Sequence, residues 1–75
     1  MTTGEVLRER TLALARSETN RDQALSDLVT TCGGRRVVVF QARQQLLAWL
    51  DSEPDQRAAM RGIEFLDELL ERLPA

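Results

Sequence analysis

Apolar residues recur at helical spacing along four stretches of this chain. They fall three and four positions apart over about 4–17, 21–32, 35–51 and 52–73. This period is typical of amphipathic helices, and short polar junctions separate the stretches. The pattern predicts an all-α fold, a compact antiparallel bundle of about four helices, with residues 1–75 forming a single helical domain.

A polar junction separates the first two helices. Thr19 or Asn20 can cap the second helix, although one longer helix with a polar middle is also open. Gly33 ends the second helix, because glycine readily adopts the left-handed conformation that follows helices. The residues expected on the inner side are Val6, Leu7, Arg10, Ala13 and Leu14 in the first helix, and Ala24, Leu25, Leu28, Val29 and Cys32 in the second.

The third helix opens with a run that locally favours a strand. Residues 37–40 are three valines and a phenylalanine, which are types enriched in strands. Because no partner strand is visible and 41–50 has a helical pattern, we predict helix throughout, with a short extended piece at 36–40 as the alternative. Phe40 and Leu47 lie about 120° or more from the Trp49 edge of an apolar arc that comprises Val38, Val39, Ala42, Leu46 and Trp49.

The fourth helix has the clearest boundary signals. Ser52 can cap it, Pro54 suits its first turn, and Asp55 at the third position completes a capping box. Pro74 stops it. Gly62 lies within its apolar arc, where a missing side chain lets another helix approach closely. The face predicted to be buried consists of Ala59, Ile63, Leu66, Leu69, Leu70 and Leu73.

The residue types that are missing exclude several kinds of chemistry. The 75 residues contain no histidine, lysine or tyrosine, and all ten basic residues are arginine. Without histidine there is no Ser-His or Cys-His nucleophile and no imidazole metal ligand, and without lysine there is no Schiff base or Walker-type phosphate contact. We therefore expect no enzyme: no catalytic residue, no cofactor and no metal site.

Composition also predicts a cellular setting. One cysteine cannot form an internal disulfide and no secretory signal is visible, which together favour a cytoplasmic protein. No apolar run approaches the roughly 18 residues that a membrane span needs, so we expect no membrane partner. Arginine in place of lysine, with abundant alanine and leucine, fits a GC-rich bacterial genome.

Charge is distributed unevenly along the chain. Residues 1–45 carry seven arginines and five acidic residues, a net charge of +2, and residues 46–75 carry three and seven, a net charge of −4. Between Leu28 and Leu50 there are three arginines and no acidic residue. Such asymmetry can steer a partner, although the isoelectric point of about 5.0 argues against nucleic acid as the main one.

A helix-turn-helix is one interpretation of the second and third helices. Arg35 and Arg36 would then open the recognition helix, where DNA-binding proteins place basic residues. Residues 37–40 would present apolar bulk to the bases, however, and Val29 is too large for the tight crossing before the turn. We therefore keep a DNA-binding regulator as an alternative and expect nucleic acid not to be the partner.

Arginines and glutamates on the last two helices share one spacing. Arg36 and Arg43 are seven residues apart, as are Glu64 and Glu71. In an antiparallel hairpin that turns near residue 53, facing residues have numbers that sum to about 106. Arg43 with Glu64 and Arg36 with Glu71 both sum to 107. We favour an internal charge ladder between the two helices; the alternative is the same ladder between two chains.

Two further features have structural explanations. The acidic residues of the fourth helix have a spacing that could hold a hard cation or serve acid–base chemistry. We favour a solvated face with an i,i+4 pair between Glu68 and Arg72. Cys32 lies within an apolar arc at a helix C-terminus, where the helix dipole disfavours a thiolate, so we expect a core thiol.

The third helix carries more apolar surface than one helix–helix seam needs. Either it is a central core helix, or Phe40 or Trp49 is exposed and forms an interaction site, because aromatic residues and arginine are favoured anchors. We predict a non-catalytic protein-interaction (adaptor or assembly) module that self-associates, with a dimer favoured. The candidate interface residues are Arg36, Phe40, Arg43, Leu47, Trp49, Glu64, Asp67 and Glu71.

Two other interpretations are a small accessory subunit of an enzyme and a signalling module. The chain as a whole resembles the small helical modules that recruit partners in signalling assemblies, including death-fold and CARD-like domains. This resemblance implies a protein-binding function. Those domains usually have six helices and more residues, and we assign no family on this likeness.

Overall fold

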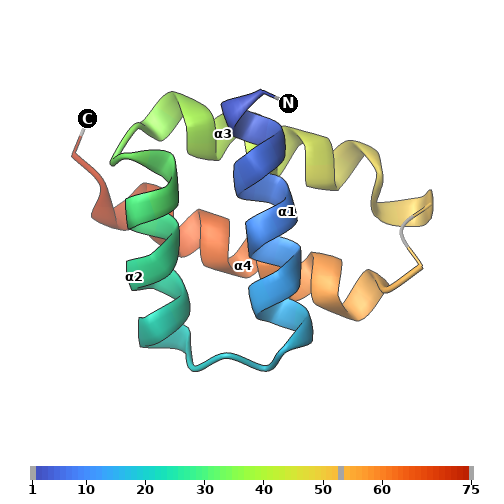
Figure 1. The fold of residues 1–75 in the computed structure, drawn as a ribbon. Helices are drawn as coiled ribbons and strands as arrows, with labels where there is room; N and C mark the ends of the chain where they lie inside the picture. Colours follow the sequence, from blue (N-terminus) through green and yellow to red (C-terminus); the bar gives the residue numbers. More distant parts are fainter. Residues whose placement is uncertain (1, 53, 75) are drawn as a thin grey trace.

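Four α-helices build the described part of the chain, residues 2–52 and 54–74 of a computed structural model. This confirms the predicted all-α bundle. The helices are α1 (Thr3–Arg16), α2 (Arg21–Cys32), α3 (Arg36–Ala48) and α4 (Gln56–Arg72), with a 3-10 turn, η1 (Leu50–Ser52), between the last two. Figure 1 shows α1 and α2 side by side in one layer, while α3 and α4 run across them in a second layer.

Local sequence signals place most helix ends. Asn20 caps α2, because its Oδ1 accepts from the backbone N–H of Asp22 at 2.9 Å. Gly33 follows α2 with φ of 64°, as expected for a left-handed C-terminal residue. Residues 36–40 are helical, which confirms helix over a short extended piece.

The start of α4 corrects one prediction. The N-cap is Asp55, whose Oδ1 accepts from the backbone N–H of Ala58 at 3.0 Å, and Ser52 belongs to the preceding η1 turn. Ser52 Oγ instead donates to the carbonyl of Trp49 at 3.1 Å. The cap moves because the chain makes a separate 3-10 turn before it enters the helix. The connection between α3 and α4 is therefore longer than predicted.

All four helices contribute residues to the core. In α1, however, the buried side differs from the predicted one. Val6, Arg10 and Ala13 are exposed, whereas Arg8 and Thr11 are buried. This happens because α1 packs against each of the other three helices, so its inner side is set by tertiary contacts rather than by residue type. The buried apolar residues of α1 are Leu7, Leu12, Leu14 and Ala15.

Gly62 marks the place where α1 crosses α4. A Cβ atom at Gly62 would lie 2.9 Å from Cγ2 of Thr11 and 3.5 Å from Cδ1 of Leu46. Thr11 itself is fully buried, and its Oγ1 donates to the carbonyl of Leu7 at 2.7 Å. The close helix approach predicted at Gly62 is therefore confirmed.

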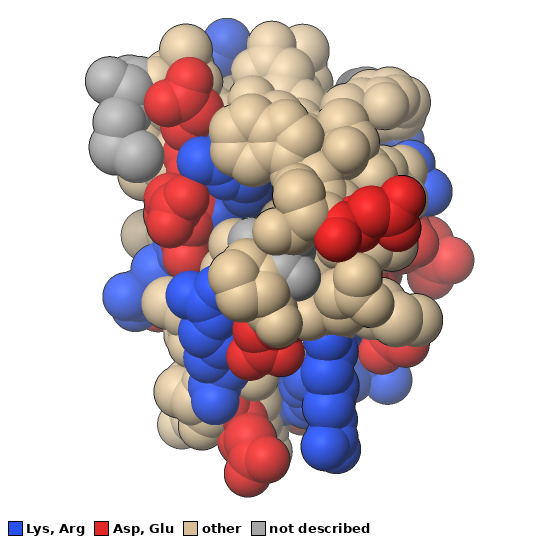
Figure 2. All heavy atoms as spheres, turned by 90° about the vertical axis from the view of Figure 1, so that its right-hand side faces the viewer, with Lys and Arg blue, Asp and Glu red and all other residues tan. Residues whose placement is uncertain are grey.

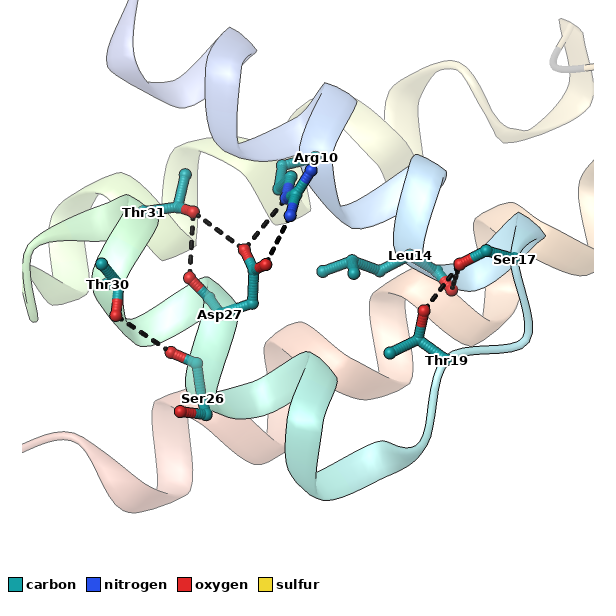
Figure 3. Close-up of polar contacts among 8 residues, drawn as sticks. All are labelled: Arg10, Leu14, Ser17, Thr19, Ser26, Asp27, Thr30 and Thr31. Atoms are coloured by element: carbon teal, nitrogen blue, oxygen red, sulfur yellow. Dashed lines mark hydrogen bonds and ion pairs between the residues drawn. The ribbon is translucent and has the colours of Figure 1, made fainter.

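An ion pair joins the two helices of the first layer. Arg10 of α1 donates twice to Asp27 of α2, at 2.9 Å from Nε and 2.5 Å from Nη2, and Figure 3 shows both contacts. Thr31 Oγ1 donates to the same carboxylate at 3.3 Å. These contacts, of which the Arg10 hydrogen bond is the largest, lower the pKa of Asp27 despite the opposing effect of partial burial.

Candidate protein interface

Three large apolar side chains of α3 are exposed along one side of the helix. Val37 is 54% exposed, Phe40 52% and Leu47 42%. Together with exposed Gln44 they follow spacings of three, four and three residues, which places all four within about 80° of helix circumference. We call Val37, Phe40, Gln44 and Leu47 the α3 stripe. Phe40 is thus outside the core, so the core explanation of this residue is wrong.

The core side of α3 is occupied by other residues. Val38, Val39, Ala42 and Leu46 are buried and belong to the hydrophobic core. They lie on the side of the helix opposite the α3 stripe. The exposed apolar side chains are therefore additional to the packing that holds α3 in the bundle.

Two arginines border the α3 stripe on the side that faces α4. Arg43 Nε donates to Asp67 Oδ1 at 2.6 Å. Arg36 Nη1 donates to the backbone carbonyls of Leu70 and Leu73, the latter at 3.0 Å. Arg36 therefore places its positive charge beside carbonyl groups near the C-terminal end of α4, where a positive charge is favourable. We call Arg36 and Arg43 the arginine edge.

The two pairs predicted for the internal charge ladder are wrong, while the same ladder between two chains stays a prediction. Arg43 pairs with Asp67 rather than Glu64, and Arg36 bonds to carbonyls rather than to Glu71. The partner of Arg43 lies three residues further along α4, close to one helical turn, because the η1 turn makes the connection between the helices asymmetric.

The acidic residues on the outer side of α4 have different environments. Glu64, Asp67 and Glu71 are exposed, and we call them the acidic edge. Asp67 pairs with Arg43. Within residues 2–52 and 54–74, neither Glu64 nor Glu71 forms an ion pair within 4 Å. The acidic edge therefore carries two negative charges that have no ionic partner in the described chain.

Glu68 and Cys32 have the environments expected of structural residues. Glu68 accepts from Arg72 at 3.1 Å, the predicted i,i+4 pair, and also from Arg21 of α2. Cys32 is a buried core residue whose Sγ donates to the carbonyl of Val29 at 3.4 Å. Among the described residues, no group of three or more Asp, Glu, Cys or His side chains could hold a metal ion.

Trp49 is exposed but does not belong to the α3 stripe. It follows the last helical residue of α3 and is 53% exposed. At 100° per residue it lies about 200° around the helix from Leu47. One face of its indole is covered by the buried Arg8, whose Cζ lies 4.4 Å from the ring centroid. Arg8 Nη1 also donates to Gln45 Oε1 at 2.9 Å, so Trp49 is held against α1.

An uncharged area lies at the end of the molecule where α3 passes into η1. Figure 2 faces this end, where α3 passes into η1, and a continuous uncharged area covers the upper centre of the view. Charged side chains of both signs lie along its left, right and lower borders. The candidate residues therefore fall in two places: the sides of α3 and α4, and this end of the bundle.

An open groove lies between the end of α1 and the start of α4. Its volume is about 710 Å³. Its lining includes three arginines and three acidic residues, so its charge favours neither anions nor cations. The charged residues are Arg16, Glu18, Asp55, Arg57, Arg61 and Glu64.

Sequence reasoning missed two members of the α3 stripe. Val37 belongs to a run of three valines, and Gln44 is polar, so residue type alone singles out neither. The signal that identifies both is their position relative to Phe40 and Leu47, because the 3-4-3 spacing places all four on one side of a helix.

Comparisons with known proteins do not assign a function to this surface. No helix in the described ranges is both long enough and apolar enough to cross a membrane. No protein-family model matches the chain, and neither a curated protein nor a solved structure resembles it significantly.

Proposed function

We propose that this chain is a non-catalytic protein-interaction module that self-associates through the α3 stripe. The observation that carries the proposal is the exposure of Phe40, a large aromatic residue that is 52% exposed between two exposed aliphatic residues. Leaving such a stripe in water costs free energy, at about 25 cal/mol for each Å² of apolar surface. Aromatic residues, phenylalanine included, and arginine are also enriched in protein interfaces.

The remainder of the chain supports an interaction role rather than catalysis. The sequence has no histidine or lysine to act as general base or Schiff-base nucleophile. The only described cysteine is buried. A single core cysteine and arginine in place of lysine also support our placement of the module in the bacterial cytoplasm.

DNA binding remains the main rival, because Arg35 and Arg36 stand at the start of α3. The position of Arg36 favours a protein partner: its guanidinium lies along the seam between α3 and α4, where it donates to the carbonyls of Leu70 and Leu73. A DNA titration separates the two functions. Phosphate contacts would give an affinity that falls steeply with salt, whereas the proposal predicts no measurable affinity at low salt.

Phe40→Glu tests the proposal. A carboxylate in the middle of an apolar interface should convert the oligomer to a monomer while the exposed position leaves the fold intact. Light scattering measures the mass and circular dichroism measures the helix content. Val6→Glu is the matched control, because Val6 is also exposed but belongs to α1. Unchanged mass in Phe40→Glu, or equal loss of mass in both variants, would contradict the proposal.

A monomeric wild type would have a different meaning. It would remove self-association and leave a heterologous partner, as expected of an accessory subunit or a signalling module. Such a partner would co-purify at fixed stoichiometry with the wild type and not with Phe40→Glu.

A further inference from the structure

The residues of the α3 stripe have a symmetric spacing. From this spacing we infer that two copies pack α3 against α3 in antiparallel orientation, with a twofold axis that crosses the stripe at the level of residue 42. This inference rests on the proposed self-association and adds the orientation and register of the interface. Positions 37, 40, 44 and 47 are separated by three, four and three residues. Reversing the helix direction about residue 42 therefore maps the stripe onto itself.

This symmetry is what an isologous interface requires. In such an interface one surface faces its own copy, so residue i contacts residue j and residue j contacts residue i. With the axis at the level of residue 42, Val37 of one copy faces Leu47 of the other. Phe40 faces Gln44 in the same way. Each aromatic ring then packs over the aliphatic stem of a glutamine, and the two aliphatic residues cover the ends.

The same rotation brings opposite charges together. Because the twofold axis keeps the α4 side of both copies on one side of the interface, the arginine edge of one copy lies next to the acidic edge of the other. Arg36 has its hydrogen bonds to carbonyls and no carboxylate partner in the described chain, and Glu64 and Glu71 have no ionic partner there. A second copy brings Arg36 close to the acidic edge.

The register of the seam between α3 and α4 specifies where these charges meet. Arg43 pairs with Asp67, so the end of α3 at Ala48 lies beside the part of α4 near Gly62. In the antiparallel arrangement Arg36 of one copy lies opposite Ala48 of the other. Its nearest acidic residue is then Glu64 of the second copy. A second copy matches the order of the α3 stripe, the arginine edge and the acidic edge by symmetry, whereas an unrelated partner would need its own complementary arrangement.

The area that a stable interface needs also favours an interface formed by both α3 and α4. A standard protein interface takes about 800 Å² from each partner, which is roughly a sixth of the 4632 Å² exposed by this chain. The α3 stripe occupies one side of a helix of 13 residues. In the twofold arrangement the acidic edge of α4 adds to the area of the α3 stripe.

Disulfide cross-linking tests the orientation. Val37→Cys and Leu47→Cys are made separately, one with a small tag so that mixed dimers differ in size. Antiparallel packing puts positions 37 and 47 of two copies face to face. Two copies of position 37 lie about 15 Å apart along the helix axis, beyond the roughly 7 Å limit of a disulfide. Wild type, with only the buried Cys32, is the control.

After oxidation with oxidised glutathione, the equimolar mixture should give a disulfide between the two variants, and each variant alone should stay uncrosslinked. Efficient cross-linking of Val37→Cys with itself would show parallel packing and overturn the inference. A dimer that is disrupted by Phe40→Glu but forms no mixed disulfide would overturn the register alone. A wild type that is monomeric by mass would overturn the proposed self-association, and the orientation with it.

Discussion

Thr11 of α1 lies directly against Gly62 of α4, because a Cβ added at Gly62 would lie 2.9 Å from Thr11 Cγ2. In an open helix, replacing glycine with alanine stabilises by about 1 kcal/mol through helix propensity. Here the new methyl group must displace a buried side chain, and such overpacking costs about 1–3 kcal/mol. We expect Gly62→Ala to lower the free energy of unfolding, measured by urea denaturation.

A double mutant identifies the clash as the cause. Thr11→Ser removes the methyl group that Gly62→Ala would strike and keeps the hydroxyl that donates to Leu7. It should therefore cost less stability in the Gly62→Ala background than in the wild type. Additive effects would mean that the two residues do not clash. A stabilised Gly62→Ala variant would mean that the helices are further apart than described.

The stacking of Arg8 on Trp49 gives a second prediction. The guanidinium is buried and its Cζ lies 4.4 Å from the ring centroid. A cation–π contact contributes about 0.5–2 kcal/mol, with the larger values at desolvated sites. A double-mutant cycle of Arg8→Met and Trp49→Leu should therefore give a coupling energy in this range. The matched control is Arg61 over Phe65, at 5.0 Å, whose exposed arginine should couple more weakly.

The sequence predicted where the helices begin and end better than which side of each helix is buried, and α1 shows why. The caps at Asn20 and Gly33 are local, so they can be identified from neighbouring residues. The buried side of α1 is not local: Arg8 is buried because Trp49 and Gln45 of a distant segment cover it. A pattern of apolar residues cannot reveal a buried arginine whose partners lie some 40 positions away.

The α3–α4 seam gives a third prediction. Arg43 and Asp67 are partly exposed, at 29% and 50% of their side chains, and exposed ion pairs contribute only about 0–1 kcal/mol. We expect a small but measurable coupling energy between Arg43→Ala and Asp67→Ala. The cycle of Arg43→Ala with Glu64→Ala should give none. A measurable coupling energy between Arg43 and Glu64, and none between Arg43 and Asp67, would contradict this pairing and favour the one predicted from the sequence.

The candidate interface could be predicted from the sequence only in part. Phe40 and Leu47 were recognised because they lie outside the apolar arc of their helix, and both are exposed. The partner of Arg43 was missed by one turn, because the rule for facing residues assumed a symmetric connection and the η1 turn is not symmetric. Trp49 was placed in the apolar arc, but the helix ends before it.

Acid should weaken the link between α1 and α2. Arg10 holds the pKa of Asp27 below its ordinary value, so the pair stabilises the fold above the unfolded pKa, near 3.9. That contribution is lost as the pH falls through the lower pKa of the folded state. The difference in unfolding free energy between wild type and Asp27→Asn should therefore be constant near neutral pH and disappear in strong acid. An NMR titration that places the Asp27 pKa at or above 3.8 would contradict this.

Self-association is the central claim, and the mass of the unmodified chain in solution tests it most directly. Sedimentation equilibrium over a wide range of concentrations should give a mass that rises to twice the 8.5 kDa of one chain and no further, because a twofold interface closes on itself. The account predicts this dimer for the wild type and 8.5 kDa for Phe40→Glu. A wild type that stays at 8.5 kDa at every concentration would contradict it.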